Sequence, residues 1–112
     1  MRLQLLSDLH LETEAFDPSP APGAELLVLA GDVDSGWTGL ERFRDWPVPV
    51  LFVPGNHEYD GRELTTARAD LREHCDALGL TMLDLDSRVI ADRAGRRVRF
   101  VATTRWCDFN LF

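Results

Sequence analysis

The chain has 112 residues, a length typical of one small domain, and its hydrophobic content of 45% is sufficient for a buried core, which excludes intrinsic disorder. Its 19 acidic and 12 basic residues give a formal net charge of −7, which disfavours nucleic acid as a partner, although bound divalent cations would reverse the field locally. With only 2 cysteines, no apolar N-terminal segment of signal-peptide length and no membrane-spanning segment, a cytoplasmic protein without a membrane partner is expected.

Short apolar runs and helical periodicities predict alternating strands and helices. The predicted elements are, in chain order, a strand at Arg2–Leu6, a strand at Glu25–Ala30, a short helix at Thr38–Trp46, a strand at Val48–Val53, a helix at Arg62–Leu78 that Gly79 ends, and strands at Leu80–Leu85, Ser87–Ala91 and Val98–Ala102. The second strand is apolar throughout, as is typical of a parallel strand buried on both faces. The alternation, followed by a hairpin, predicts an α/β fold whose mostly parallel sheet becomes mixed at its edge.

Three polar motifs directly follow the first three predicted strands: Ser7-Asp8-Leu9-His10, Ala30-Gly31-Asp32 and Pro54-Gly55-Asn56-His57-Glu58. The carboxyl ends of parallel strands meet at the edge where open α/β sheets bind ligands. In an extended segment, Asp8 and His10 would point to the same side and could meet one cation. Carboxylate, imidazole and amide oxygen ligands suit Mn²⁺, Fe or Zn²⁺, and a carboxylate can bridge two such ions.

Each motif alone is more simply interpreted as a turn, and only their joint occurrence after three strands favours a metal site. A different phosphatase class is also conceivable. Asp84 and Asp86, like Asp32 and Asp34, superficially resemble the nucleophile loop of haloacid-dehalogenase-type phosphatases. That chemistry requires a downstream lysine, and this sequence contains none.

The order D-x-H, GD, GNHE resembles the calcineurin-like metallophosphoesterase family, and the run from Trp106 to Phe109 is similar to a WTDF-type segment of bacterial members. The resemblance implies a β-sandwich flanked by helices, in α-β-β-α layers. The chain would form a part of it, namely the mostly parallel first sheet with its helices and at most the first strands of the second sheet. We therefore expect residues 1–112 to be a single metallophosphoesterase domain that is incomplete at its carboxyl end.

The resemblance also implies a role for each motif residue. Asp8 and His10 would bind one metal ion, Asp32 would bridge two ions, and Asn56 would bind the second. His57 would face the substrate and either protonate the leaving oxygen or stabilise charge on the phosphoryl group. Glu58 would support the ligands from behind. The complete family site holds two divalent ions, here Mn, Fe or Zn, and hydrolyses a phosphomonoester or phosphodiester through a metal-bound hydroxide.

The sequence departs from the family pattern in two ways. Family members often carry an acid three residues after the bridging aspartate, which can partner the GNH histidine. Ser35 stands there instead, and Asp34, one position earlier, is the nearest acid and is expected to support the ligands together with Glu58. In addition, the family's later lone histidine and Gly-His-x-His have no counterpart, because the only histidine besides His10 and His57 is His74, which is expected to pack at the border of the helix's apolar face.

Two functions therefore stay open. The first is a metal-dependent phosphoester hydrolase of the calcineurin-like type with a dinuclear site. The second is a catalytically incomplete fragment or one half of a split protein, holding one ion rather than two, that binds a metal or a partner chain without hydrolysis. In the second case a partner chain or a dimer would supply the missing histidines.

Overall fold

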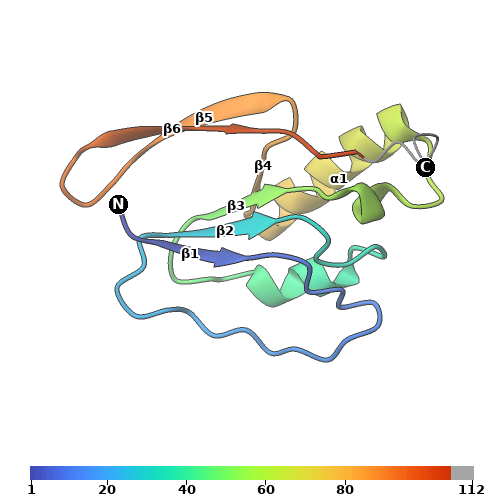
Figure 1. The fold of residues 1–112 in the computed structure, drawn as a ribbon, viewed down its shortest axis with the longest axis horizontal. Helices are drawn as coiled ribbons and strands as arrows, with labels where there is room; N and C mark the ends of the chain where they lie inside the picture. Colours follow the sequence, from blue (N-terminus) through green and yellow to red (C-terminus); the bar gives the residue numbers. More distant parts are fainter. Residues whose placement is uncertain (107–112) are drawn as a thin grey trace, which may run out of the picture.

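The computed structural model describes residues 1–106. Of the expected WTDF-like segment, only Trp106 is among the described residues. Figure 1 shows the path of the chain. The elements are β1 (Leu3–Leu6), β2 (Leu26–Ala30), the 3₁₀ helix η1 (Thr38–Phe43), β3 (Val50–Val53), the 3₁₀ helix η2 (Asn56–Tyr59), α1 (Leu64–Leu78), β4 (Thr81–Met82), β5 (Asp86–Ala91) and β6 (Arg97–Ala102).

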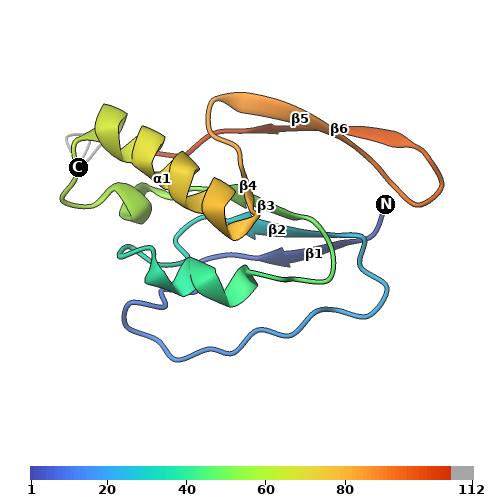
Figure 2. The ribbon, with the colours of Figure 1, turned by 180° about the vertical axis from the view of Figure 1, so that it is seen from behind.

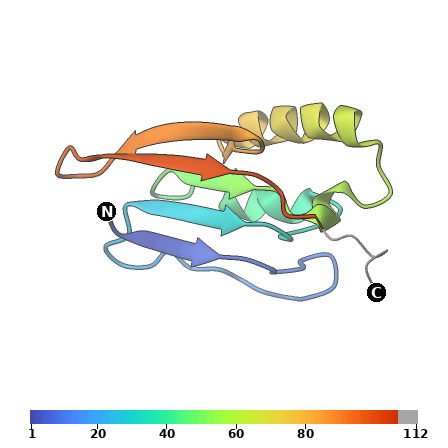
Figure 3. The same ribbon diagram turned by 45° about the horizontal axis from the view of Figure 1, so that its top comes forward.

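The central sheet consists of four parallel strands in the order β1-β2-β3-β4. Since all four strands run in the same direction, the loops that follow β1, β2 and β3 leave from one edge, as Figure 3 shows. That edge carries the three polar motifs. The predicted α/β fold with a parallel sheet is therefore confirmed, and so is the predicted delivery of the motifs to one place.

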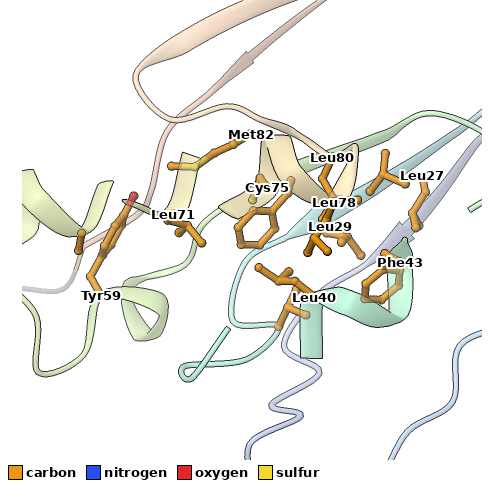
Figure 4. Close-up of a cluster of buried hydrophobic side chains, with 14 residues drawn as sticks. Leu27, Leu29, Leu40, Phe43, Tyr59, Leu71, Cys75, Leu78, Leu80 and Met82 are labelled. Carbon is orange, nitrogen blue, oxygen red and sulfur yellow. The ribbon is translucent and has the colours of Figure 1, made fainter. Parts of the chain in front are cut away.

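One face of the sheet is covered by the helices, which lie in front of the strands in Figure 2. The main core lies between them, where Leu29 and Phe52 of the sheet pack against Leu71 and Cys75 of α1, all four fully buried or nearly so. Figure 4 shows this cluster together with Leu40 and other residues of the helical layer. Burying leucine and phenylalanine side chains in this way supplies the main driving force for folding.

The other face of the sheet is partly covered by the β5–β6 hairpin. Leu26 and Leu51 are buried there against Ile90 and Phe100 of the hairpin. The expectation that the hairpin joins the parallel sheet as a mixed edge is wrong, because β5 and β6 pair with each other in a separate antiparallel sheet. The described part of the chain thus forms helical, parallel-sheet and antiparallel-sheet layers, in agreement with a partial calcineurin-like sandwich.

The strand predicted at Leu80–Leu85 is shorter than expected, and its shortness explains the separate hairpin. β4 pairs with β3 only at Thr81 and Met82. The chain then turns, because the Asp84 side chain is drawn into a buried polar network and Leu85 adopts a left-handed conformation with φ of 56°. The chain therefore leaves the parallel sheet before β5 begins.

The helix predicted at Thr38–Trp46 is a 3₁₀ helix that ends at Phe43. It stops because Arg44 is extended and Asp45 has a positive φ of 61°, neither of which continues a helix. β3 begins two residues later than predicted: Pro49 accepts a hydrogen bond from the Leu27 N–H at 3.0 Å but has no N–H of its own to donate, so regular pairing begins at Val50.

The long helix agrees closely with its prediction. Glu63 caps the first turn of α1, since its carboxylate accepts hydrogen bonds from the N–H groups of Thr65 and Thr66 at 3.1 and 2.7 Å. Gly79 ends it in a left-handed conformation with φ of 78°. Within residues 1–106, α1 and the shorter helices all lack the length and apolar character needed to cross a membrane.

A buried polar network around Asp84 connects the two sheets. The Asp84 carboxylate accepts hydrogen bonds from the Tyr59 hydroxyl at 2.8 Å, from Arg68 Nε at 3.2 Å and from the Thr104 N–H at 3.0 Å. Burial by itself would raise the pKa of Asp84, but these donors outweigh it and hold the pKa below its usual value. The network therefore attaches the segment after β6 to α1 and η2.

We expect Asp84→Asn to lower the free energy of unfolding by about 1–3 kcal/mol, because an amide nitrogen would face a hydrogen-bond donor in a buried site. Since the folded pKa of Asp84 is lowered, the stabilisation is present above the unfolded value of 3.8 and is lost as the pH falls through the folded value. Urea denaturation at pH 7 and in acid measures both effects. The control is Asp86→Asn at an exposed position, which should change stability by less than about 0.5 kcal/mol; equal effects of the two variants would contradict the assignment.

Candidate metal centre

The loops after β1 and β2 run side by side beyond the ends of their strands. The N–H groups of Asp8, His10 and Leu11 donate to the carbonyl oxygens of Gly31, Asp32 and Val33 at 2.9, 3.0 and 2.8 Å. These hydrogen bonds hold the D-x-H motif in register with the GD motif. Two of the three sequence motifs are therefore joined by their backbones.

The structure brings Asp8, His10 and Asp32 together. One ligand atom from each side chain can be chosen so that all three lie within 4.8 Å of one another, and the residues are exposed or partly buried, so the group is open to solvent. Two carboxylate oxygens and one imidazole nitrogen form a donor set that suits Mn²⁺, Fe or Zn²⁺. The residues present thus fit a divalent cation.

The expected reason for this convergence, an extended backbone, is wrong. Asp8, His10 and Asp32 have φ values of 55°, 47° and 53°, in the left-handed region that residues other than glycine rarely occupy. Their side chains converge because each loop turns sharply, rather than because alternate residues of a strand share a face. Such strained backbone is concentrated at functional sites when the surrounding contacts hold it in place.

His10 is oriented by Glu12, a residue that the sequence interpretation did not single out. His10 Nδ1 lies 3.1 Å from Glu12 Oε1, while the other oxygen of Glu12 accepts a hydrogen bond from the Ser35 N–H at 3.3 Å. The bond to the carboxylate raises the pKa of His10 more than partial burial lowers it. If Nδ1 donates to Glu12, Nε2 is the atom that would offer a lone pair to a metal ion. The sequence signal that could have identified Glu12 is the position of an acidic residue two residues after His10.

The loops after β2 and β3 approach each other at Gly55. A Cβ atom at Gly55 would lie 2.1 Å from Asp32 Oδ1, which is far too close, so a residue with no side chain is required there. This proximity allows Asp32 Oδ1 to accept a hydrogen bond from the His57 N–H at 3.1 Å. The third motif is thereby linked to the second.

The Glu58 side chain connects the loop after β2 to the loop after β3. Its fully buried carboxylate accepts hydrogen bonds from the N–H groups of Asp32, Gly55 and Asp34 at 2.8, 2.7 and 3.1 Å. Burial raises the pKa of Glu58 to about 7, although the three donors oppose this shift. Glu58 therefore supports the site through the backbone of both loops, and its side chain does not belong to the Asp8–His10–Asp32 group.

The hydrogen-bond partner of the His57 side chain, which the sequence left open, is Asp60. Its Nδ1 lies 2.8 Å from Asp60 Oδ2, and this hydrogen bond raises the pKa of His57 above its ordinary value. Asp34, the nearest acid expected from sequence, instead binds the N–H groups of Gly36 and Gly39 and shapes the loop before η1. The His57 ring lies 5.7 Å from the His10 ring, at the rim of the candidate metal group.

The remaining two candidates differ in position. Asn56, the first residue of η2, lines the same cavity as Asp8 and Asp32. His74 is outside this group: its ring packs against Trp37 with centroids 6.2 Å apart, and its Nε2 is buried without a hydrogen-bond partner among residues 1–106. His74 therefore contributes to packing, as its place at the border of the apolar face of α1 predicts.

Asp60→Asn should lower the pKa of His57 toward 6.5 in the metal-free protein, because the neutral amide no longer favours the imidazolium. A pH titration of the imidazole resonances by NMR measures this change. Glu12→Gln is the matched control and should lower the pKa of His10 while changing that of His57 little. An unchanged His57 pKa in Asp60→Asn would show that Asp60 does not partner His57 in solution.

Glu58→Gln should lower the free energy of unfolding by about 1–3 kcal/mol, because one side-chain N–H would oppose a backbone N–H. It should also weaken Mn²⁺ binding by roughly 10–100-fold by loosening the loop of Asp32. The exposed substitution Glu73→Gln should change neither quantity. Calorimetric titration with Mn²⁺ measures the affinity of both variants, and urea denaturation measures their stability. If Glu58→Gln bound Mn²⁺ as tightly as the wild type, the supporting role of Glu58 would be contradicted.

The raised pKa of Glu58 also predicts a pH dependence of stability in the metal-free chain. The stabilisation linked to a raised folded pKa is fully present below the unfolded value of 4.5 and is lost as the pH rises through about 7. Because the raised pKa values of His10 and His57 add a loss in the same direction, stability should fall with rising pH in both chains, and the fall should be larger in the wild type than in Glu58→Gln. Urea denaturation between pH 5 and 8 measures it.

The sequence was compared with known proteins. The sequence model of the calcineurin-like phosphoesterase family matches residues 1–105, which include all three motifs and every element from β1 to β6. The searches of curated proteins and of solved structures gave no match. Because the family match extends over nearly the whole chain and the motif residues converge at one sheet edge, this chain belongs to the calcineurin-like phosphoesterase family.

Proposed function

We propose that this protein hydrolyses a phosphomonoester or phosphodiester with the aid of divalent metal ions held at the carboxyl edge of the parallel sheet. The observation that carries the proposal is the convergence of Asp8, His10 and Asp32, whose ligand atoms lie within 4.8 Å of one another. Membership of the family implies metal-dependent phosphoester hydrolysis in general. A divalent ion at this place would supply Lewis-acid stabilisation of phosphoryl oxygens and lower the pKa of water.

In the proposed site, Asp8 and His10 would hold a first ion, and Asp32 and Asn56 would hold a second, with Asp32 available to both. Asp32 is suited to this bridging role because one of its oxygens is already oriented by the His57 N–H. Asn56 lines the same cavity and offers a neutral amide oxygen. Mn²⁺ is the ion we select for tests, since it accepts carboxylate, imidazole and amide ligands together.

His57 is proposed to face the substrate as a proton donor to the leaving oxygen. Its Nδ1 is engaged by Asp60 at 2.8 Å, which leaves Nε2 for the substrate. The raised pKa of His57, caused first by that hydrogen bond, favours the protonated form that a general acid needs. Asp60 acts through His57, by orienting the ring and stabilising its positive charge.

Two substitutions separate the proposed roles. Asp32→Asn should abolish Mn²⁺-dependent hydrolysis and lower Mn²⁺ content, because the bridging charge is lost. His57→Ala should retain Mn²⁺ but lower the turnover number by roughly 10²–10⁴-fold, the usual contribution of general acid catalysis. Asp70→Asn, at an exposed position of α1, serves as the control for loss of one negative charge.

The measurements are elemental analysis of bound metal and steady-state hydrolysis of a chromogenic phosphoester in the presence of Mn²⁺. Loss of Mn²⁺ from His57→Ala would make His57 a ligand rather than a proton donor. Hydrolysis by the wild-type chain no faster than by Asp32→Asn would contradict the proposed function. Binding of Mn²⁺ without any hydrolysis would favour the alternative of a catalytically incomplete metal-binding fragment.

A further inference from the structure

The cavity at the candidate metal centre has two chemically different walls. One is formed by the loops after β1, β2 and β3 and includes Asp8, Asp32 and Asn56. The other is formed by the end of β6 and the residues that follow it, including Val101 and Arg105. The cavity has a volume of about 740 Å³, which is ample for a small-molecule phosphoester.

Arg105 is the one cationic side chain among the described residues that line this cavity, and two of the other lining residues are carboxylates. Several other arginines are engaged in the fold: Arg68 binds Asp84, and Arg72 donates to the carbonyl oxygen of Met82. Arg105 is exposed, and within residues 1–106 its guanidinium makes no hydrogen bond or ion pair with another residue. Its donors are therefore not engaged by the described fold, and the residue borders the cavity.

The backbone that carries Arg105 is held on both sides by the loop that contains Asn56. The hydroxyl of the buried Thr104 donates to the carbonyl oxygen of Pro54 at 2.8 Å, two residues before Asn56. On the other side, the Trp106 ring stacks on Tyr59 of η2, with centroids 5.6 Å apart and planes inclined by 25°. These contacts fix the backbone position of Arg105 relative to the loop of Asn56, while its exposed side chain stays free to adjust to a substrate.

We propose that Arg105 binds non-bridging oxygens of the substrate's phosphoryl group and is a substrate-binding residue of this site. The inference rests on the proposed function. Divalent ions held by Asp8 and Asp32 would offset the charge of these carboxylates, so that Arg105 and the candidate metal ligands would contact the same phosphoryl group. A guanidinium is always charged and offers a planar pair of N–H donors that matches two phosphate oxygens. No charge on the described part of the β6 wall competes for that pair.

The test is calorimetric titration of inorganic phosphate into the Mn²⁺-loaded chain. Arg105→Ala should weaken phosphate binding about tenfold or more, because charge-assisted bidentate hydrogen bonds are lost. Arg105→Lys should give an intermediate affinity, since the charge stays but the paired donors do not. The matched control is Arg97→Ala, which removes the same charge from an exposed position of β6. Mn²⁺ affinity and melting temperature should be the same in all four proteins.

Phosphate affinity unchanged by Arg105→Ala, or weakened equally by Arg97→Ala, would overturn the inference, as would the absence of phosphate binding by the wild-type chain. The binding measurement is independent of turnover. If Arg105→Ala weakens phosphate binding but the wild-type chain hydrolyses no phosphoester, the inference about Arg105 stands and the proposed function fails. If the wild-type chain hydrolyses a phosphoester and Arg105→Ala changes neither phosphate affinity nor KM, only the inference about Arg105 fails.

Discussion

The buried carboxylate of Glu58 is the constraint on which the site depends. The loops after β2 and β3 both turn sharply, so their backbone N–H groups cannot be paired within a strand or a helix. Glu58 accepts three of them, one each from Asp32, Asp34 and Gly55. A buried N–H without an acceptor is costly, so one side chain stabilises two loops at once. Because His10 donates its N–H to Asp32, the first loop is held by the same arrangement.

This support explains how the site tolerates strained backbone. Asp8, His10 and Asp32 each adopt a left-handed conformation, which brings two carboxylates and an imidazole to one point. Left unsupported, negative charges placed so close together would favour opening of the loops. The backbone hydrogen bonds among the loops and the buried Glu58 oppose that opening, and a bound cation would remove the repulsion. The fold therefore holds the candidate ligands in position and leaves their charge uncompensated.

A second buried carboxylate, that of Asp84, holds the segment after the hairpin in place beside the candidate metal centre. It receives hydrogen bonds from Tyr59 of η2, from Arg68 of α1 and from the Thr104 N–H after β6. The two sheets are thus joined at the edge where the cavity lies. One wall of the cavity comes from the parallel sheet and the other from the hairpin, so the alignment of the walls depends on this network.

The sequence alone was sufficient for the order of the six strands, η1 and α1, for the parallel sheet, for the end of α1 at Gly79 and for the delivery of the polar motifs to one edge, but not for η2. These features follow from local patterns, namely apolar runs, helical spacing and residues that end a strand or helix. It could not predict that Asp60 partners His57 or that Glu12 orients His10, and it left open whether β5 and β6 join the parallel sheet or begin a second one. Those outcomes depend on left-handed turns and on contacts such as that between Asp84 and Thr104. Only the folded chain decides them, because residues distant in sequence must first be brought together.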